Sequence, residues 1–166
     1  MTNFTRKVEV AANCAIVLVA ILLGVVIIRD RFIAPKQVST ISPGAKIPIT
    51  DVDWSAHGET LVLALQKGCH FCLESAPFYR RLAGEVAQHG KVRLLAVLPG
   101  ELTESKAYLE SLGVPVTEMR RLPLSAIPVR GTPTLILVDH KGVVQRVWAG
   151  QLPPEKEAEV LAAVLT

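Results

Sequence analysis

The chain has 166 residues and a formal net charge of +3, and half of its residues are hydrophobic. This length accommodates one domain of ordinary size and a short additional segment. The small net charge, without a basic run or a patch of basic and aromatic residues, argues against nucleic acid as a partner.

The N-terminal part carries a long apolar run. Every residue from Val10 to Ile28 except Asn13 is apolar or glycine. A helix of this length spans about 28 Å, close to the thickness of the hydrocarbon core of a bilayer. We therefore expect a single transmembrane helix over residues 10–28, after a short tail of residues 1–9. The alternative is a cleaved signal peptide, but its apolar region is only about 7–15 residues long and ends in a small-x-small site.

Basic residues lie on both sides of the run, since Arg6 and Lys7 precede it and Arg29 and Arg31 follow it. The positive-inside rule therefore leaves the orientation undecided. The sequence after the run is rich in proline and serine, which is typical of a linker. We assign residues 29–42 to the linker and residues 43–166 to a folded domain.

Short strands and helices alternate in this domain. The apolar pattern predicts strands at 47–52, 60–65, 92–98, 134–138 and 143–148, and helices at 71–87, 104–112 and 154–165. A hairpin-like turn from Asp139 to Gly142 joins the last two strands. Alternating strands and helices, followed by a hairpin and a closing helix, predict an α/β fold with a mixed central sheet flanked by helices.

A cysteine pair, Cys69-His70-Phe71-Cys72, begins the helix that follows the strand at 60–65. Two cysteines three apart at a helix start place their sulfurs on one face, close enough to form a disulfide. In this setting the motif indicates a redox centre. The only other cysteine, Cys14, lies in the apolar run, so the second half of a zinc site is missing and we predict no metal site. A structural or metal-binding pair is the remaining alternative.

The two sulfurs of this pair are expected to differ in reactivity. Unpaired N–H groups and the positive end of the helix dipole favour a thiolate at Cys69, which makes it the attacking sulfur. Cys72, one turn further along and more buried, would resolve the mixed disulfide. His70 either contributes positive charge or a hydrogen-bond donor at this site, or is a solvated residue without an electrostatic role.

Two prolines lie at positions that need a structural reason. Pro77 falls inside the helix predicted at 71–87, where proline removes a backbone hydrogen bond, so it marks either a kink or a helix end. Pro133 precedes the strand at 134–138. It is either an ordinary edge residue or part of a cis Thr132–Pro133 bond.

These features resemble the thioredoxin superfamily and, within it, the membrane-tethered thiol–disulfide oxidoreductases of the TlpA and ResA type. The resemblance covers about residues 43–165. It rests on the strand before Cys69-x-x-Cys72, on Pro77 in a kinked helix, and on Thr132-Pro133 before a β-hairpin. It implies a thioredoxin-like fold in which Pro133 is cis and packs beside the disulfide. It also implies that the backbone of Thr132 pairs with an extended substrate segment.

The chain departs from plain thioredoxin around the cysteines. Gly68 stands where thioredoxin has a tryptophan, and Leu63 stands where it has a buried acid. His70 and Phe71 replace the Gly-Pro between the cysteines, and we assign them a redox-tuning role. Glu74 is a candidate for proton handling, although an acidic residue in a first helical turn also simply favours the helix dipole.

The resemblance implies an anchored reductase that keeps client protein cysteines reduced on the outer, periplasmic face of the cytoplasmic membrane. Its clients would be apocytochromes, as in cytochrome c maturation, or proteins with metal-site cysteines. A membrane electron-relay protein would recharge it. The Cys69–Cys72 disulfide would be the only redox group, without a further cofactor. A disulfide oxidase or isomerase of the same fold is the first alternative.

Two further functions were weighed against the sequence. A peroxidase of this fold needs Pro and Ser or Thr at positions that hold Val62 and Gln66, which argues against it. A non-enzymatic copper-delivery protein would use Cys69 and Cys72 together with a histidine such as His140, because soft thiolates bind Cu(I).

Overall fold

The computed structural model describes residues 15–24, 40–89, 91–116 and 118–165. The chain divides into two units, Met1–Gln37 and Val38–Thr166. In the first unit, residues 15–24 are helical and their large apolar side chains are exposed.

The N-terminal segments predicted from the sequence fall mainly outside this description. The tail at 1–9 lies wholly outside the described residues, and the span predicted at 10–28 extends beyond them at both ends. Of the linker predicted at 29–42, only residues 40–42 are described. No helix among the described residues combines the length and the apolar character needed to cross a membrane.

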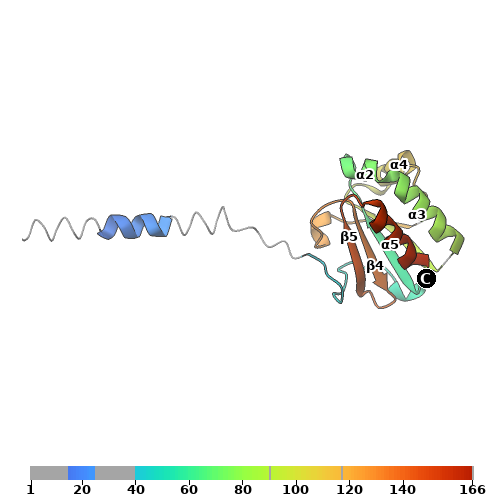
Figure 1. Ribbon diagram of the computed structural model, residues 1–166, viewed down its shortest axis with the longest axis horizontal. Helices are drawn as coiled ribbons and strands as arrows, with labels where there is room; N and C mark the ends of the chain where they lie inside the picture. Colours follow the sequence, from blue (N-terminus) through green and yellow to red (C-terminus); the bar gives the residue numbers. More distant parts are fainter. Residues whose placement is uncertain (1–14, 25–39, 90, 117, 166) are drawn as a thin grey trace, which may run out of the picture. The chain divides into compact units, whose positions relative to one another are not determined.

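The second unit is built on one five-stranded sheet with helices against it (Figure 1). Its elements, in chain order, are η2 (Trp54–Ala56), β1 (Glu59–Ala64), α2 (His70–Glu74), α3 (Ala76–His89), β2 (Val92–Leu98), α4 (Leu102–Ser111), β3 (Glu118–Arg121), η3 (Leu124–Ala126), β4 (Thr134–Asp139), β5 (Val144–Ala149) and α5 (Pro154–Leu165).

The strand order is β3-β2-β1-β4-β5, with β1 in the centre. β1 pairs in parallel with β2, and β2 pairs in parallel with β3. β4 is antiparallel to both β1 and β5. The α/β fold with a mixed sheet predicted from the sequence is therefore confirmed. Five of the predicted strands and helices match β1, β2, β4, β5 and α5 to within one residue at each end.

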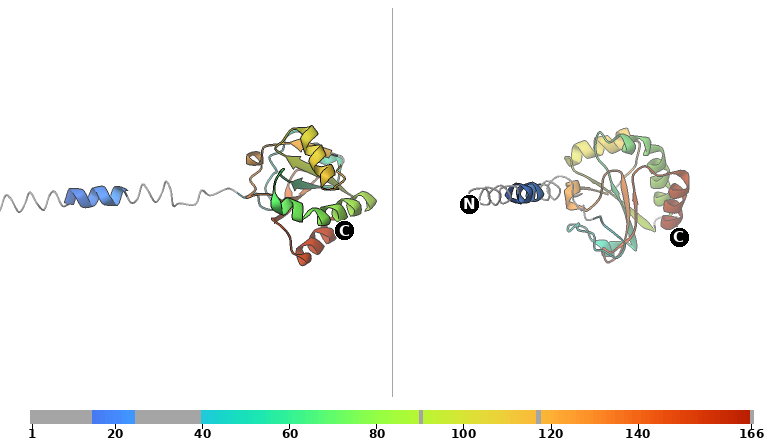
Figure 2. Two further views of the ribbon diagram at one scale, coloured as in Figure 1. Left: turned by 90° about the horizontal axis from the view of Figure 1, so that it is seen from above. Right: turned by 60° about the vertical axis from the view of Figure 1, so that its left-hand side comes forward.

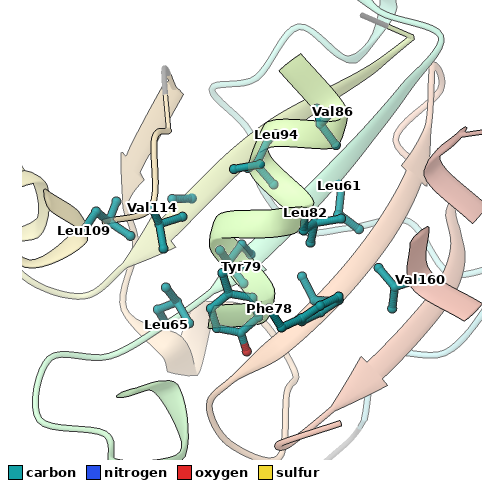
Figure 3. Close-up of a cluster of buried hydrophobic side chains, with 14 of the residues drawn as sticks. Leu61, Leu65, Phe78, Tyr79, Leu82, Val86, Leu94, Leu109, Val114 and Val160 are labelled. Carbon is teal, nitrogen blue, oxygen red and sulfur yellow. The ribbon is translucent and has the colours of Figure 1, made fainter. Parts of the chain in front are cut away.

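One face of the sheet is covered by helices. α3 and α5 lie side by side against it in Figures 1 and 2. Figure 3 shows the apolar cluster on this face, where Tyr79 and Leu82 of α3 and Val160 of α5 pack with Leu61 of β1. Leu109 of α4 belongs to the same cluster. This is the amphipathic pattern of a helix that buries one stripe against a sheet.

The opposite face is covered by irregular chain. Its buried cluster combines side chains from β1, β2, β4 and β5 with Ile41, Ile47, Ile49, Val52 and Ile127, and none of its members in the described part of the chain belongs to an α-helix. Ile41, which the sequence analysis placed in the linker, is thus part of this core.

The strand predicted at 47–52 is wrong. Residues 47–52 form no strand: just before them Lys46 makes an isolated bridge with Val143, and the N–H of Ile47 donates to the carbonyl of Gly142 at 2.9 Å. Ile47 and Ile49 are buried while the residue between them is exposed, so the alternation that suggested a strand is real. It arises because the side chains of Ile47 and Ile49 pack into the buried cluster on this face of the sheet.

Strand β3 was not predicted. It has the sequence Glu-Met-Arg-Arg and lies at the edge of the sheet, so it shows neither an apolar run nor a buried face. Charged residues on a short edge strand are a common way to prevent pairing with another chain.

Ile127 tests whether the irregular cover contributes to stability. It is 1% exposed and lies on the face without α-helices. We expect Ile127→Ala to lower the free energy of unfolding by about 3 kcal/mol, because it removes buried methylene groups and leaves a cavity. The control is Leu102→Ala, at a side chain that is 49% exposed, where we expect a change below about 0.5 kcal/mol. Urea unfolding of the two variants makes the comparison, and equal losses would contradict this account.

Candidate redox site

The chain turns sharply between the end of β1 and the cysteine pair. The N–H of Leu65 still donates to the carbonyl of Val97 at 3.0 Å, and the N–H of Cys69 donates back to the carbonyl of Gln66 at 3.2 Å. Gly68 lies between them with φ of +79°, a left-handed conformation that glycine adopts without steric cost. The turn therefore delivers Cys69 directly from the centre of the sheet to the start of α2.

Cys69 is the N-cap residue of α2. Its Sγ accepts a hydrogen bond from the backbone N–H of Cys72 at 3.2 Å. The two cysteines are joined by a disulfide, and their Cα atoms are 5.2 Å apart. In the reduced protein the same N–H and the partial positive charge at the helix start would stabilise a thiolate on Cys69.

The two sulfurs differ in accessibility. Cys72 is completely buried and belongs to the same apolar cluster as Leu63, whereas Cys69 is half-buried at the edge of that cluster. Only Cys69 is thus open to a partner. This is the difference expected between an attacking and a resolving sulfur.

The helix after the pair is interrupted. α2 ends at Glu74, Ser75 closes it by donating its N–H to the carbonyl of Phe71 at 3.1 Å, and α3 begins at Ala76. Pro77 lies in the first turn of α3, where the missing N–H is tolerated. The single helix predicted at 71–87 is therefore two helices, and the interruption predicted at Pro77 is present, two residues before the proline itself.

A loop far along the chain meets Cys69. The Thr132–Pro133 peptide bond is cis, as the resemblance predicted. The carbonyl oxygen of Thr132 lies 3.3 Å from the Sγ of Cys69, although the two residues are 63 positions apart. Pro133 is buried and Thr132 is half-buried. The pairing of Thr132 with a substrate segment stays a prediction.

The residues between the cysteines lie on the outside. His70 Nε2 is 3.1 Å from Glu74 Oε1, and both side chains are substantially exposed. The ring of His70 meets the ring of Phe71 edge-on at 5.6 Å between centroids, and Phe71 is 53% exposed. The structure thus pairs Glu74 with His70. Their roles in redox tuning and proton handling stay predictions.

The copper ligands weighed from the sequence are not brought together. His140 follows the last residue of β4. Cys69 lies near the other end of that strand, where β4 begins at Thr134. A strand of this length separates the two by about 17–20 Å. Among the described residues no three His, Cys, Asp or Glu side chains are grouped to hold a metal ion. The set of Cys69, Cys72 and His140 is therefore wrong.

The sequence analysis assigned no role to Thr134 or to Gly150. The Thr134 hydroxyl donates to the carbonyl of Gly131 at 2.8 Å, and the N–H of Gly150 donates to the carbonyl of Pro133 at 2.7 Å. A threonine opening an otherwise apolar strand, directly after an X-Pro pair, was the available signal for Thr134.

Three features together define a thioredoxin-fold protein with a disulfide: the strand order, the cysteine pair at the start of a helix, and the cis-proline loop beside that pair. No protein-family model matches the sequence, and no curated protein matches it either. Solved structures do match in fold.

Three of these structures illustrate the likeness. One is the thioredoxin domain of a thiol–disulfide oxidoreductase from Bacteroides vulgatus, with a TM-score of 0.59 and 16% identity, covering 76% of this chain and 100% of that one. Another, from Chlorobium tepidum, is assigned as the thiol:disulfide interchange protein DsbE, with a TM-score of 0.56 and 21% identity over 76% and 100% of the two chains. A thiol:disulfide interchange protein from a Bacteroides species has a TM-score of 0.53 and 19% identity over 75% and 86%. They establish that this chain has the thioredoxin fold.

Proposed function

We propose that this chain is a thiol–disulfide oxidoreductase that exchanges the Cys69–Cys72 pair with cysteines of client proteins. One observation carries the proposal: the Sγ of the half-buried Cys69 accepts a hydrogen bond from the Cys72 N–H at the helix start and is bonded to the completely buried Cys72. A partly accessible nucleophile with a buried resolving partner is the arrangement that disulfide exchange requires.

The reaction in the reducing direction needs only the two sulfurs of this chain. The Cys69 thiolate attacks one sulfur of a client disulfide, forms a mixed disulfide and releases the other client sulfur as a thiolate. Cys72 then attacks the Cys69 sulfur, which forms the Cys69–Cys72 disulfide and releases the second client thiolate. The two protons lost by Cys69 and Cys72 balance the two taken up by the client thiols, and two electrons pass to the client.

The finer proposal is an anchored reductase on the outer face of the cytoplasmic membrane. The apolar run at 10–28 supports the anchor, because its length suits a bilayer. The resemblance to membrane-tethered oxidoreductases supports the reducing direction and clients such as apocytochromes. A dithiol protein of the membrane would return the two electrons and regenerate the Cys69–Cys72 dithiol.

Cysteine variants test the order of the two attacks. We expect Cys72→Ser to accumulate a mixed disulfide with a client or with glutathione, because the resolving sulfur is missing while Cys69 remains reactive. Cys69→Ser should form no adduct on Cys72, because Cys72 is completely buried. Non-reducing electrophoresis and mass spectrometry measure the adducts. An adduct on Cys72 in the Cys69→Ser variant would reverse the assigned roles.

The reduction potential of the pair tests the direction of electron flow. Equilibration of the full chain in detergent with glutathione buffers should give a value near that of thioredoxin, about −270 mV. A value near the oxidising end for this fold, about −120 mV, would instead make the protein a disulfide-forming catalyst.

Labelling of Cys69 in intact cells tests the location of the domain. After brief reduction, a membrane-impermeant thiol reagent should label Cys69, and a cytosolic thiol protein in the same cells should stay unlabelled as the control. Labelling only after lysis would place the domain in the cytosol and refute the proposed location.

A further inference from the structure

Three consecutive carbonyl groups in the loop beside Cys69 each have a different partner. The carbonyl of Gly131 accepts from the Thr134 hydroxyl at 2.8 Å. The carbonyl of Pro133 accepts from the N–H of Gly150 at 2.7 Å. The carbonyl between them, on Thr132, lies 3.3 Å from the Sγ of Cys69. The two flanking carbonyls are thus fixed, and the middle one faces the sulfur.

Thr134 is suited to hold this loop firmly. It is 2% exposed and begins β4, where it lies opposite Ala64 of β1 and Ala149 of β5. A buried hydroxyl that loses its hydrogen bond pays a desolvation penalty, because water cannot replace the lost partner. The bond to Gly131 is therefore maintained, and it ties the loop to the central strands of the sheet.

We infer that Thr134 is a positioning residue of the redox site, which holds the Thr132 carbonyl against Cys69 and so limits how readily that cysteine ionises. The inference rests on the proposed exchange function for its biological meaning. Thr134 acts through Gly131 and Thr132, while Gly150 restrains the same loop from the other side.

Two contacts at one sulfur oppose each other. The N–H of Cys72 donates to Cys69 Sγ and stabilises negative charge there. The Thr132 carbonyl oxygen carries partial negative charge, so it repels a thiolate and accepts a weak hydrogen bond from a thiol. A loop that drifts away from Cys69 therefore leaves the first contact intact and weakens the second, which raises the thiolate fraction at a given pH.

Charged side chains on the surrounding elements are already paired near the surface. Lys67, in the turn before Cys69, lies 3.6 Å from Glu104 of α4, and His70 of α2 lies 3.1 Å from Glu74. In the loop itself, the Nε of Arg130 donates a hydrogen bond to the hydroxyl of Thr40 at 2.9 Å. Thr134 is a member of none of these pairs, so an altered ionisation of Cys69 in a Thr134 variant reports on the loop.

The test is the pH profile of Cys69 alkylation. The reduced full chain is treated with iodoacetamide at a series of pH values, and the modified Cys69 peptide is quantified by mass spectrometry. We expect Thr134→Val to lower the midpoint of the profile by about half a pH unit, the size that a weak S–H···O contact allows. Thr134→Ser keeps the hydroxyl and should retain the wild-type midpoint.

Thr60→Val is the matched control. Thr60 is also almost completely buried, at 1%, and its hydroxyl accepts from Arg93 at 3.1 and 3.2 Å. It pairs with Val138, at the other end of β1 and β4 from the cysteines. Its loss should lower stability and leave the Cys69 midpoint unchanged. Equal midpoints in Thr134→Val and Thr60→Val would overturn the inference.

Two glycine positions provide a second test, which does not require the Thr134→Val variant to fold. Gly150 and Gly44 have φ of +82° and +86°, and a Cβ added at either meets no atom within 4 Å. Alanine therefore strains the backbone similarly at both positions. Gly150→Ala should lower the Cys69 midpoint, whereas Gly44→Ala, in a turn before β1, should not. A shift in both, or in neither, would contradict the inference.

Failure of the inference and failure of the proposed function give different results. Exchange of the wild-type pair with glutathione tests the function, whatever the variants do. Wild-type exchange without a midpoint shift in Thr134→Val and Gly150→Ala would refute only the positioning role. Midpoint shifts in a protein that does not exchange would refute the proposed function and leave the positioning role standing.

Discussion

The chemistry of this site depends on one contact, the hydrogen bond from the Cys72 N–H to the Cys69 sulfur. It forms only if the first cysteine ends a turn and caps a helix at the same time. Gly68 permits that turn through its left-handed backbone, and β1 fixes where it begins. The interruption of the helix at Ser75 lies beyond this contact, so α3 can follow the sheet without disturbing the cap.

The register of the sheet explains why the second half of the site meets the first. β1 and β4 are antiparallel neighbours, and Ala64 at the end of β1 lies opposite Thr134 at the beginning of β4. The chain that leaves β1 and the chain that enters β4 must therefore emerge at the same end of the sheet. Cys69 and Thr132 belong to these two segments, which brings together residues 63 positions apart.

The parts of the fold that the sequence predicted are those whose signal is local. Buried strands appear as apolar runs, and the cysteine pair identifies its own helix start. The segment at 47–52 has the alternation of a strand but forms none, and alternation alone could not reveal this because strand pairing is a tertiary property. The edge strand β3 carries no apolar run. The role of Thr134 depends on a hydrogen bond within a loop whose shape the sequence does not specify.

Burial supports the proposed order in which the two sulfurs would act. Cys72 shares its apolar cluster with Leu63 and Tyr79, and burial raises the pKa of Tyr79 to about 12, so this neighbour stays neutral. Apolar surroundings disfavour a thiolate on Cys72, whereas the helix cap favours one on Cys69. In the proposed exchange, Cys72 would therefore remain a thiol until a mixed disulfide forms beside it. Its proton would then pass towards the departing client sulfur, since Leu63 provides no buried acid to take it.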